Sequence, residues 1–121
     1  MPRALLDEAK LHPAIREKVA TSHRDIVEEV QRAVAEHAVV VVGMAINPHP
    51  KRARKILTKR GTKFHYLEYG GYASQWRRRT ALKMWTGWPT FPMVFVKGTL
   101  IGGADDLEAL IASGELDKLL A

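Results

Sequence analysis

Residues 88–106 read WPTFPMVFVKGTLIGGADD, and this stretch decides the fold. Its first five residues contain two prolines and form a rigid connector. Two short apolar runs at 93–96 and 99–101 flank a Lys-Gly pair, which is the pattern of a β-hairpin. A double glycine at 102–103 then interrupts the chain before acidic residues at 105–106, which suit a helix start. The stretch therefore predicts a connector, a hairpin and a closing helix that reaches Ser113.

Upstream, residues 39–42 are four consecutive valines. A continuous β-branched run is typical of a central strand buried on both faces, in a parallel or mixed sheet flanked by helices. A second strand is predicted at 64–67. Three helices are predicted around these strands: one from a capping box at 22–25 to about Glu36, one from the N-cap Asn47 to about Arg60, and one over 74–86.

This order of elements predicts an α/β/α sandwich on a four-stranded mixed sheet. Residues 3–20 predict one or two short helical pieces, broken near His12-Pro13 because proline disfavours a helical conformation in the residue before it. We therefore expect an N-terminal helical extension over 1–21 and one domain over 22–121. An α/β single domain agrees with 121 residues and a hydrophobic content of 46%.

Composition excludes several functional classes. No window approaches the ~18 consecutive apolar residues of a transmembrane helix, and no apolar segment of signal-peptide type follows the N-terminus, so we expect a cytoplasmic protein without membrane partners. The sequence has no cysteine. This excludes disulfides, thiolate nucleophiles, and zinc or iron–sulfur clusters held by cysteines of this chain.

The net charge of +6 is unevenly distributed. Residues 51–83 contain eleven basic side chains and one acidic side chain, whereas the segments on either side are net acidic. This block could dock an acidic protein partner, or it could represent the solvated faces of two helices. Nucleic-acid binding is the weaker hypothesis, because no pattern of interleaved base-stacking aromatic residues accompanies the charge.

Two motifs resemble the glutaredoxin family of the thioredoxin-like fold. Trp88-Pro89-Thr90-Phe91-Pro92 is similar to the family segment that ends in a cis-proline, in the form typical of the single-cysteine (monothiol) branch. Residues 102–106, Gly-Gly-Ala-Asp-Asp, are similar to the family's Gly-Gly-x-Asp-Asp segment. The resemblance covers about residues 25–121 and implies a place in cell redox homeostasis as a glutathione-dependent thiol–disulfide oxidoreductase.

The resemblance places the family's redox motif at Asn47-Pro48-His49-Pro50, with Asn47 in the position of the nucleophilic cysteine. In the family, the free N–H groups of the helix N-terminus stabilise a thiolate at that position. Asn47 would use the same groups as an ordinary cap. We therefore expect no catalytic residues, no thiol exchange and no cluster ligation through these positions.

The resemblance also implies a groove for glutathione, or for a related γ-glutamyl or thiol ligand. The positions that match the family's groove are Thr90, Phe91, Pro92, Gly103, Ala104 and Asp105. We expect the peptide bond before Pro92 to be cis. Residues 105–106 could contact a ligand ammonium group, or serve as the N-cap and first-turn acid of the last helix.

One cation of the family's groove is missing, because Met44 occupies the expected lysine position. Lys83, Arg79 and Lys51 are the candidate replacements. The triple arginine at 77–79 points in three directions around a helix. We expect these arginines to be solvated while the neighbouring tryptophans Trp76, Trp85 and Trp88 anchor the helix. The five histidines lack metal-site spacing, so no metal site is predicted.

Overall fold

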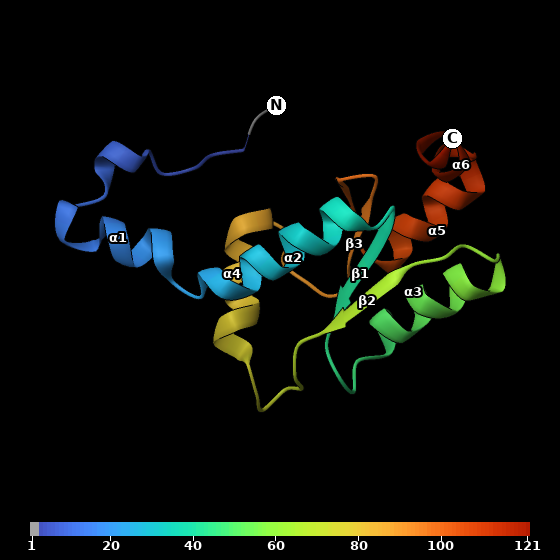
Figure 1. The fold of residues 1–121 in the computed structure, drawn as a ribbon, viewed down its shortest axis with the longest axis horizontal. Coiled ribbons are helices and arrows are strands. Elements are labelled where there is room, and N and C mark those ends of the chain that lie inside the picture. Colours follow the sequence, from blue (N-terminus) through green and yellow to red (C-terminus); the bar gives the residue numbers. More distant parts are fainter. Residues whose placement is uncertain (1–2) are drawn as a thin grey trace.

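A computed structural model describes residues 3–121 as four strands and seven helical segments (Figure 1). The strands form one mixed sheet in the order β2-β1-β3-β4. Strand β1 is parallel to β2 and antiparallel to β3, and β3 forms a hairpin with β4. Their bounds are Val39–Gly43 (β1), His65–Glu68 (β2), Met93–Val96 (β3) and Thr99–Gly102 (β4). The valine run is the central, fully buried strand, as predicted.

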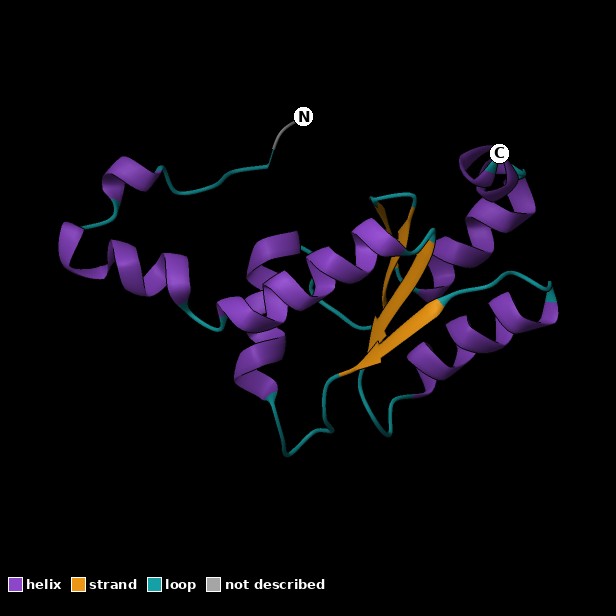
Figure 2. Cartoon of the chain, viewed as in Figure 1, coloured by secondary structure: helices purple, strands orange, loops and turns teal. Residues whose placement is uncertain are grey.

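Helices cover both faces of this sheet (Figure 2). Val40 and Val42 of β1 pack with α2 (Arg24–Glu36) and α4 (Trp76–Thr86) on one face. Val39 and Val41 pack on the other face with α3 (Pro48–Lys59), α5 (Ala104–Ser113) and the short α6 (Glu115–Leu120). Side chains alternate along a strand, so one valine run supplies both cores. The predicted α/β/α sandwich is confirmed.

The N-terminal segment contains a 3₁₀ turn, η1 (Glu8–Lys10), and α1 (Pro13–Thr21). The two are separated at His12-Pro13, where the sequence predicts a break. Figure 1 shows this segment projecting from one side of the sandwich. Arg3 Nη1 donates to the Thr86 carbonyl oxygen at 2.8 Å, at the end of α4. The predicted extension also includes residues 1–2, which lie outside the described residues, and its boundary at residue 21 stays a prediction.

The predicted start of α2 is wrong. Ser22 is the C-cap of α1, whose Thr21 immediately precedes it, so it does not form the capping box expected at 22–25. His23 is the N-cap of α2, with a left-handed φ of 49° and no side-chain cap hydrogen bond. Only Ser22 and His23 separate the two helices, and this short connection, with its left-handed residue, takes precedence over the capping pattern.

Two other helix starts also differ from the prediction. Helix α4 begins at Trp76 rather than at 74, after Gln75 with a left-handed φ of 55°. Helix α5 begins at Ala104, with Gly103 as its N-cap. Asp106 Oδ2 accepts from the Gly103 N–H at 2.9 Å, so the acid acts from the first turn rather than at the cap.

The prediction for the α4 side chains is wrong at two positions. Arg79 is 6% exposed, whereas Trp76 is 56% exposed. Arg79 Nη1 donates to the carbonyl oxygens of Tyr69 at 2.8 Å and Ser74 at 2.5 Å. The loop before α4 leaves these carbonyls without a backbone donor, and a buried guanidinium supplies one.

The basic block of residues 51–83 does not form one surface. Most of its arginines and lysines lie on α3 and α4, which cover opposite faces of the sheet. Several of its arginines form ion pairs within the molecule: Arg52 with Asp105 and Glu108, Arg60 with Asp117, and Arg78 with Asp25. Within residues 3–121, no helix is both long and apolar enough to span a bilayer.

Replacing Arg79 by alanine should destabilise the domain by about 2–3 kcal/mol, because two loop carbonyls lose a charged donor in a buried setting. The matched control is Arg77→Ala, on the same helix but exposed, which should change stability by less than about 0.5 kcal/mol. Urea unfolding of both variants measures the difference. Equal stabilities would contradict a stabilising role for the buried guanidinium.

Candidate functional site

The first part of the candidate site is the N-terminus of α3, which follows the C-terminal end of β1. Asn47 is the N-cap of this helix, as predicted, and its Oδ1 accepts from the His49 N–H at 3.0 Å. Pro48 occupies the first helical position, where a missing N–H costs nothing. The amide oxygen of Asn47 therefore lies against the N–H groups at the start of α3, where an anion could otherwise bind.

The second part is the cis-proline loop. The Phe91–Pro92 peptide bond is cis, as predicted, and both residues are buried. Gly103 lies against this loop, and a methyl group added there would be 3.5 Å from the Pro92 carbonyl oxygen and 3.9 Å from Trp88 Nε1. Gly103 thus brings the start of α5 to within van der Waals reach of the proline loop.

The third part is the N-terminus of α5, which an arginine of α3 holds in place. Arg52 Nη2 lies 2.5 Å from Asp105 Oδ1, and Arg52 Nη1 lies 3.1 Å from Glu108 Oε1. The hydrogen bond from Arg52 is the main cause that lowers the pKa of Asp105, and the charges of Arg52 and His49 act in the same direction. The same hydrogen bond raises the pKa of Arg52. The two helix N-termini of the site are thus joined by an exposed ion pair.

The structure separates the three candidate replacement cations. Lys83 Nζ lies 5.8 Å from the centre of the Phe91 ring, next to the proline loop. Arg79 is buried and donates to loop carbonyls, and Lys51 lines a cavity between α3 and β2. Met44, in the family's lysine position, is only 7% exposed and packs in the core. Lys83 is the one candidate of the three beside the predicted groove.

The predicted groove residues meet in pairs. Pro92 lies against Gly103, Lys83 faces Phe91, and Arg52 connects α3 to Asp105. Ala104 is buried behind Asp105, and Thr90 is exposed. Among the described residues, no hydrogen bond or ion pair connects Asn47 or His49 to the proline loop. The positions of the predicted groove thus come from three chain segments, which the sheet and Arg52 connect.

Two residues of this region escape prediction from the sequence. Arg52 is one of several basic residues of α3, and nothing in its immediate sequence distinguishes it from Lys51. Trp88 Nε1 is buried and has no hydrogen-bond partner within residues 3–121, a fact that depends on tertiary packing.

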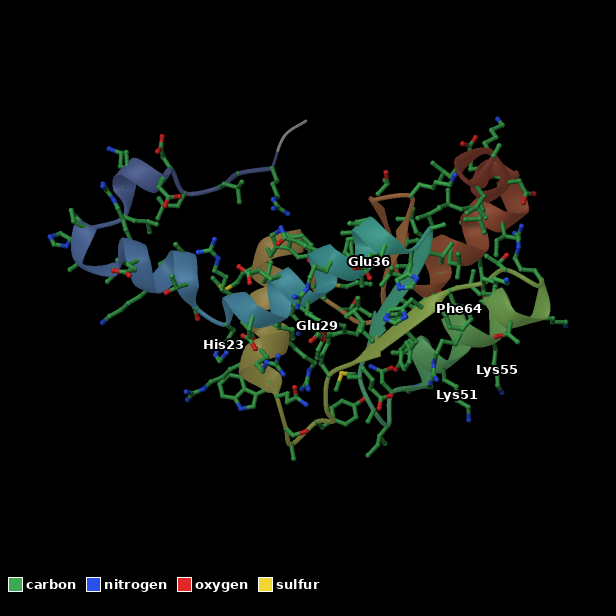
Figure 3. All side chains as sticks on the ribbon, viewed as in Figure 1. His23, Glu29, Glu36, Lys51, Lys55 and Phe64 are labelled. Carbon is green, nitrogen blue, oxygen red and sulfur yellow. The ribbon has the colours of Figure 1, made fainter. Side chains whose placement is uncertain are left out.

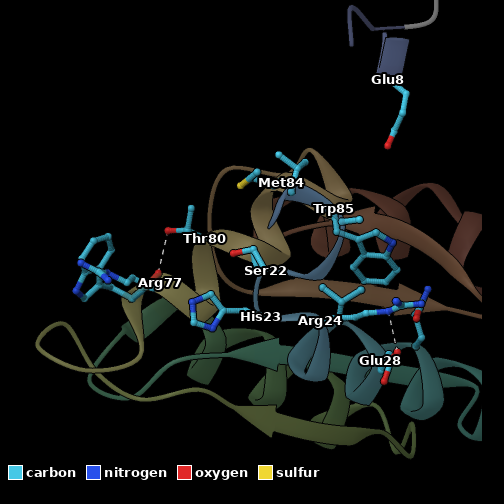
Figure 4. Close-up of a pocket in the computed structure, with 15 residues that line it drawn as sticks. Glu8, Ser22, His23, Arg24, Glu28, Arg77, Thr80, Met84 and Trp85 are labelled. Carbon is cyan, nitrogen blue, oxygen red and sulfur yellow. Dashed lines mark hydrogen bonds and ion pairs between the residues drawn. The ribbon is translucent and has the colours of Figure 1, made fainter. Parts of the chain in front are cut away.

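Two further features lie outside the groove. A cavity of about 910 Å³ lies between the N-terminal segment, α2 and α4 (Figure 4), where Trp76, Met84 and Trp85 contribute apolar surface. Within the described part of the chain, no three histidine or acidic side chains gather in a way that could hold a metal ion.

Comparison with known proteins identifies relatives along most of the chain. Residues 47–101 match the family model described as glutaredoxin. A glutaredoxin-like protein of Dictyostelium discoideum is 50% identical over 94 residues, which are 78% of this chain and 76% of that protein. Glutaredoxin-C1 of Arabidopsis thaliana is 33% identical over 95 residues, again 78% of this chain and 76% of that protein.

Solved structures share the fold. The crystal structure of wheat glutaredoxin has a TM-score of 0.68 and 33% identity, covering 78% of this chain and 90% of that chain. The crystal structure of a buckwheat glutaredoxin–glutathione complex has a TM-score of 0.71 at 24% identity, covering 83% and 91% of the two chains.

The Arg52–Asp105 pair should stabilise the folded state at neutral pH and lose this effect at low pH. Because its pKa is lowered in the folded state, Asp105 contributes stability above its unfolded pKa of about 4, and this contribution is lost as the pH falls through the folded pKa. Asp105→Asn should therefore unfold more easily than the parent at pH 7, and the difference should disappear near pH 2. Urea unfolding at the two pH values measures this difference in stability. The comparison variant is Asp117→Asn, which removes the acid of the Arg60–Asp117 pair.

Proposed function

The chain belongs to the glutaredoxin family, and we propose that it is a cysteine-less member that binds glutathione, or a related γ-glutamyl ligand, without exchanging thiols. The observation that carries this proposal is Asn47. It stands where the family places its thiol and uses its side chain to cap α3 instead. The proposed role is that of a binding module rather than an oxidoreductase.

Thiol exchange requires a thiolate that attacks a disulfide and forms a mixed disulfide. The 121 residues contain no cysteine, so no residue of this chain can take that part. The carboxamide of Asn47 is not a nucleophile at neutral pH. The degenerate motif Asn47-Pro48-His49-Pro50 therefore supports a positioning role at most.

The remaining parts of the groove support ligand binding. An extended peptide ligand can pair with the backbone of Phe91 beside cis-Pro92. The Gly103 N–H already donates to Asp106, but the N–H groups of residues 104 and 105 at the start of α5 suit a carboxylate, because a helix N-terminus carries free donors and a positive dipole end. Backbone contacts of this kind tolerate changes in side chains. They are consistent with a γ-glutamyl carboxylate held against Gly103 and Ala104.

Two side chains complete the proposed site. Lys83 lies beside Phe91 and can pair with the glycine carboxylate of glutathione, in place of the lysine that is absent at Met44. The Oδ2 of Asp105 can accept from the ligand ammonium group, because Arg52 donates to Oδ1. Buckwheat glutaredoxin, which shares the fold, was solved with glutathione, and this makes glutathione the natural probe.

The alternative of one basic docking face over 51–83 is not favoured, because α3 and α4 lie on opposite sides of the sheet. A protein segment in the groove is a second possible ligand of the same site. Cytoplasmic location and a place in cell redox homeostasis stay predictions.

Titration with reduced glutathione tests the site directly. We expect saturable amide shifts at His49, Phe91 and residues 104–106, recorded by ¹⁵N–¹H NMR on the whole chain. Lys83→Ala should weaken binding about fivefold to tenfold through loss of one charge-assisted contact. The control Lys97→Ala, in the β3–β4 turn, should bind like the parent. No shifts at millimolar glutathione would sink the proposal.

Restoring the thiol gives an independent test. Asn47→Cys should acquire glutathione-dependent disulfide reduction in an assay coupled to glutathione reductase, because the free N–H groups of α3 lower the thiol pKa. The parent and Asn47→Ser, which retains a capping hydroxyl, should both give only background. Turnover by the parent would refute thiol inactivity, and an inert Asn47→Cys with a freely titratable thiol would argue against a retained groove.

A further inference from the structure

A basic groove separate from the proposed glutathione site lies between α3 and the edge of the sheet. It has a volume of about 610 Å³ and is lined by Lys51, Arg54, Lys55, Thr58, Lys59, Phe64 and Tyr66. Four of the seven lining residues are cations. Among residues 3–121, none of these four takes part in an ion pair, in contrast to the α3 arginine that faces α5. Figure 3 shows Lys51 and Lys55 pointing outward from α3.

The floor of this groove is an edge strand with unused backbone groups. Strand β2 is at the end of the sheet order and pairs only with β1 in the described chain. The Tyr69 N–H donates to the Gly43 carbonyl oxygen at 3.0 Å, on the β1 side. Because the backbone groups of successive residues alternate between the two sides of a strand, those of Tyr66 and Glu68 face away from β1. They form an open edge of the kind that accepts another strand.

We infer that this edge binds an acidic peptide in extended conformation, added beside β2 with alternate acidic side chains facing the α3 lysines. Phe64 and Tyr66 pack on the α3 side of the sheet, so alternate residues of an added strand would point to the same side. Lysines four residues apart on α3 are separated by about 6 Å along the helix. Alternate residues of a strand are about 6.6 Å apart. The two spacings match, so carboxylates at every second position meet successive lysines.

The opposite side of the added strand requires a different side chain. Leu67 packs against the core on the α2 side of β2 and is half-buried there. The intervening residues of the peptide are therefore expected to be apolar or β-branched. The partner segment is therefore one in which acidic and β-branched residues alternate. Its backbone hydrogen bonds with β2 provide affinity, and the α3 lysines provide specificity for the acidic side chains.

The groove favours a peptide over a nucleic acid. Arg54 already covers the Tyr66 ring, with its guanidinium carbon 4.0 Å from the ring centre, so this ring is not open to base stacking. The Tyr66 hydroxyl donates to Glu68 Oε1 at 2.9 Å, so this hydroxyl is not available to donate to a base or a phosphate. The open N–H and C=O groups of the edge are satisfied in full only by another polypeptide.

The test uses the whole chain and a nine-residue acetylated and amidated peptide, Thr-Glu-Val-Glu-Val-Glu-Val-Glu-Thr. We expect saturable amide shifts over residues 64–68, and slower hydrogen exchange of the Tyr66 and Glu68 N–H groups on binding. Binding by Lys51→Glu/Lys55→Glu should be about tenfold weaker or worse. The control Lys18→Glu/Arg32→Glu makes the same change in net charge on α1 and α2, and its affinity should stay within about twofold of the parent.

Two control peptides are tested with the unmodified protein. One has the same composition with its four glutamates contiguous, and the other is N-methylated at alternate residues. Both should bind at least about tenfold more weakly, because the first misplaces the acids and the second removes the strand hydrogen bonds. Equal binding of all three peptides would reduce the groove to unspecific charge attraction and overturn the inference. So would tighter binding of a nine-nucleotide oligothymidine, or no shift at millimolar peptide. Glutathione binding at the other site does not enter these outcomes.

Discussion

Burial of β1 on both faces is the constraint on which the rest of this structure depends. Four consecutive valines cannot face water, so the strand must lie inside the sheet and helices must cover both sides. Its C-terminal end then leads through one loop to Asn47, while its antiparallel neighbour β3 begins immediately after cis-Pro92. Two of the three segments of the proposed groove are thus placed by strands that pair with each other. The hydrophobic core thus positions these segments without any contribution from the side chain at position 47.

The role of Asn47 shows how a helix N-terminus can be kept while its chemistry changes. Free N–H groups at the start of α3 can stabilise a thiolate, bind an anion, or be capped by a side chain, and all three use the same donors. With asparagine at position 47, a side chain of the protein itself caps the helix. The hydrogen bond to the His49 N–H then stabilises the folded state and not a thiolate. The donors at the start of α5 are less committed, because Asp106 accepts only from the Gly103 N–H. The anion site that we propose therefore uses the second helix N-terminus and not the first.

The sequence predicts the sheet and its layers well because these depend on strong local patterns: the valine run, the Lys-Gly hairpin turn, and the Trp-Pro-Thr-Phe-Pro segment with its cis bond. It fails where tertiary packing decides. His23 and Gln75 adopt a left-handed backbone because of the way the chain enters the helix that follows each of them. Neither position carries the glycine that usually marks such a conformation in a sequence. The burial of Arg79 depends on two loop carbonyls that no helical pattern reveals. In the site, Asn47 and Pro92 could be identified locally, whereas the link from Arg52 to Asp105 required the packing of α3 against α5.

The surplus of positive charge in residues 51–83 has a structural explanation that a count of charges does not give. Helix α3 divides its cations between two sides: Arg52 faces α5 and joins the two helix N-termini, while Lys51, Lys55 and Lys59 face the open edge of β2. On the opposite face of the sheet, Arg78 pairs with Asp25 of α2 and Arg79 is buried. Most arginines of the block thus hold elements together, whereas Lys51, Lys55 and Lys59 form no ion pair among the described residues and lie together on one side of α3. Since lysine is a flexible point charge without the planar fork of arginine, such a surface suits carboxylates presented at a regular spacing rather than one fixed bidentate contact. The two proposed binding regions therefore use different sides of a single helix: Arg52 faces α5, and the lysines face β2.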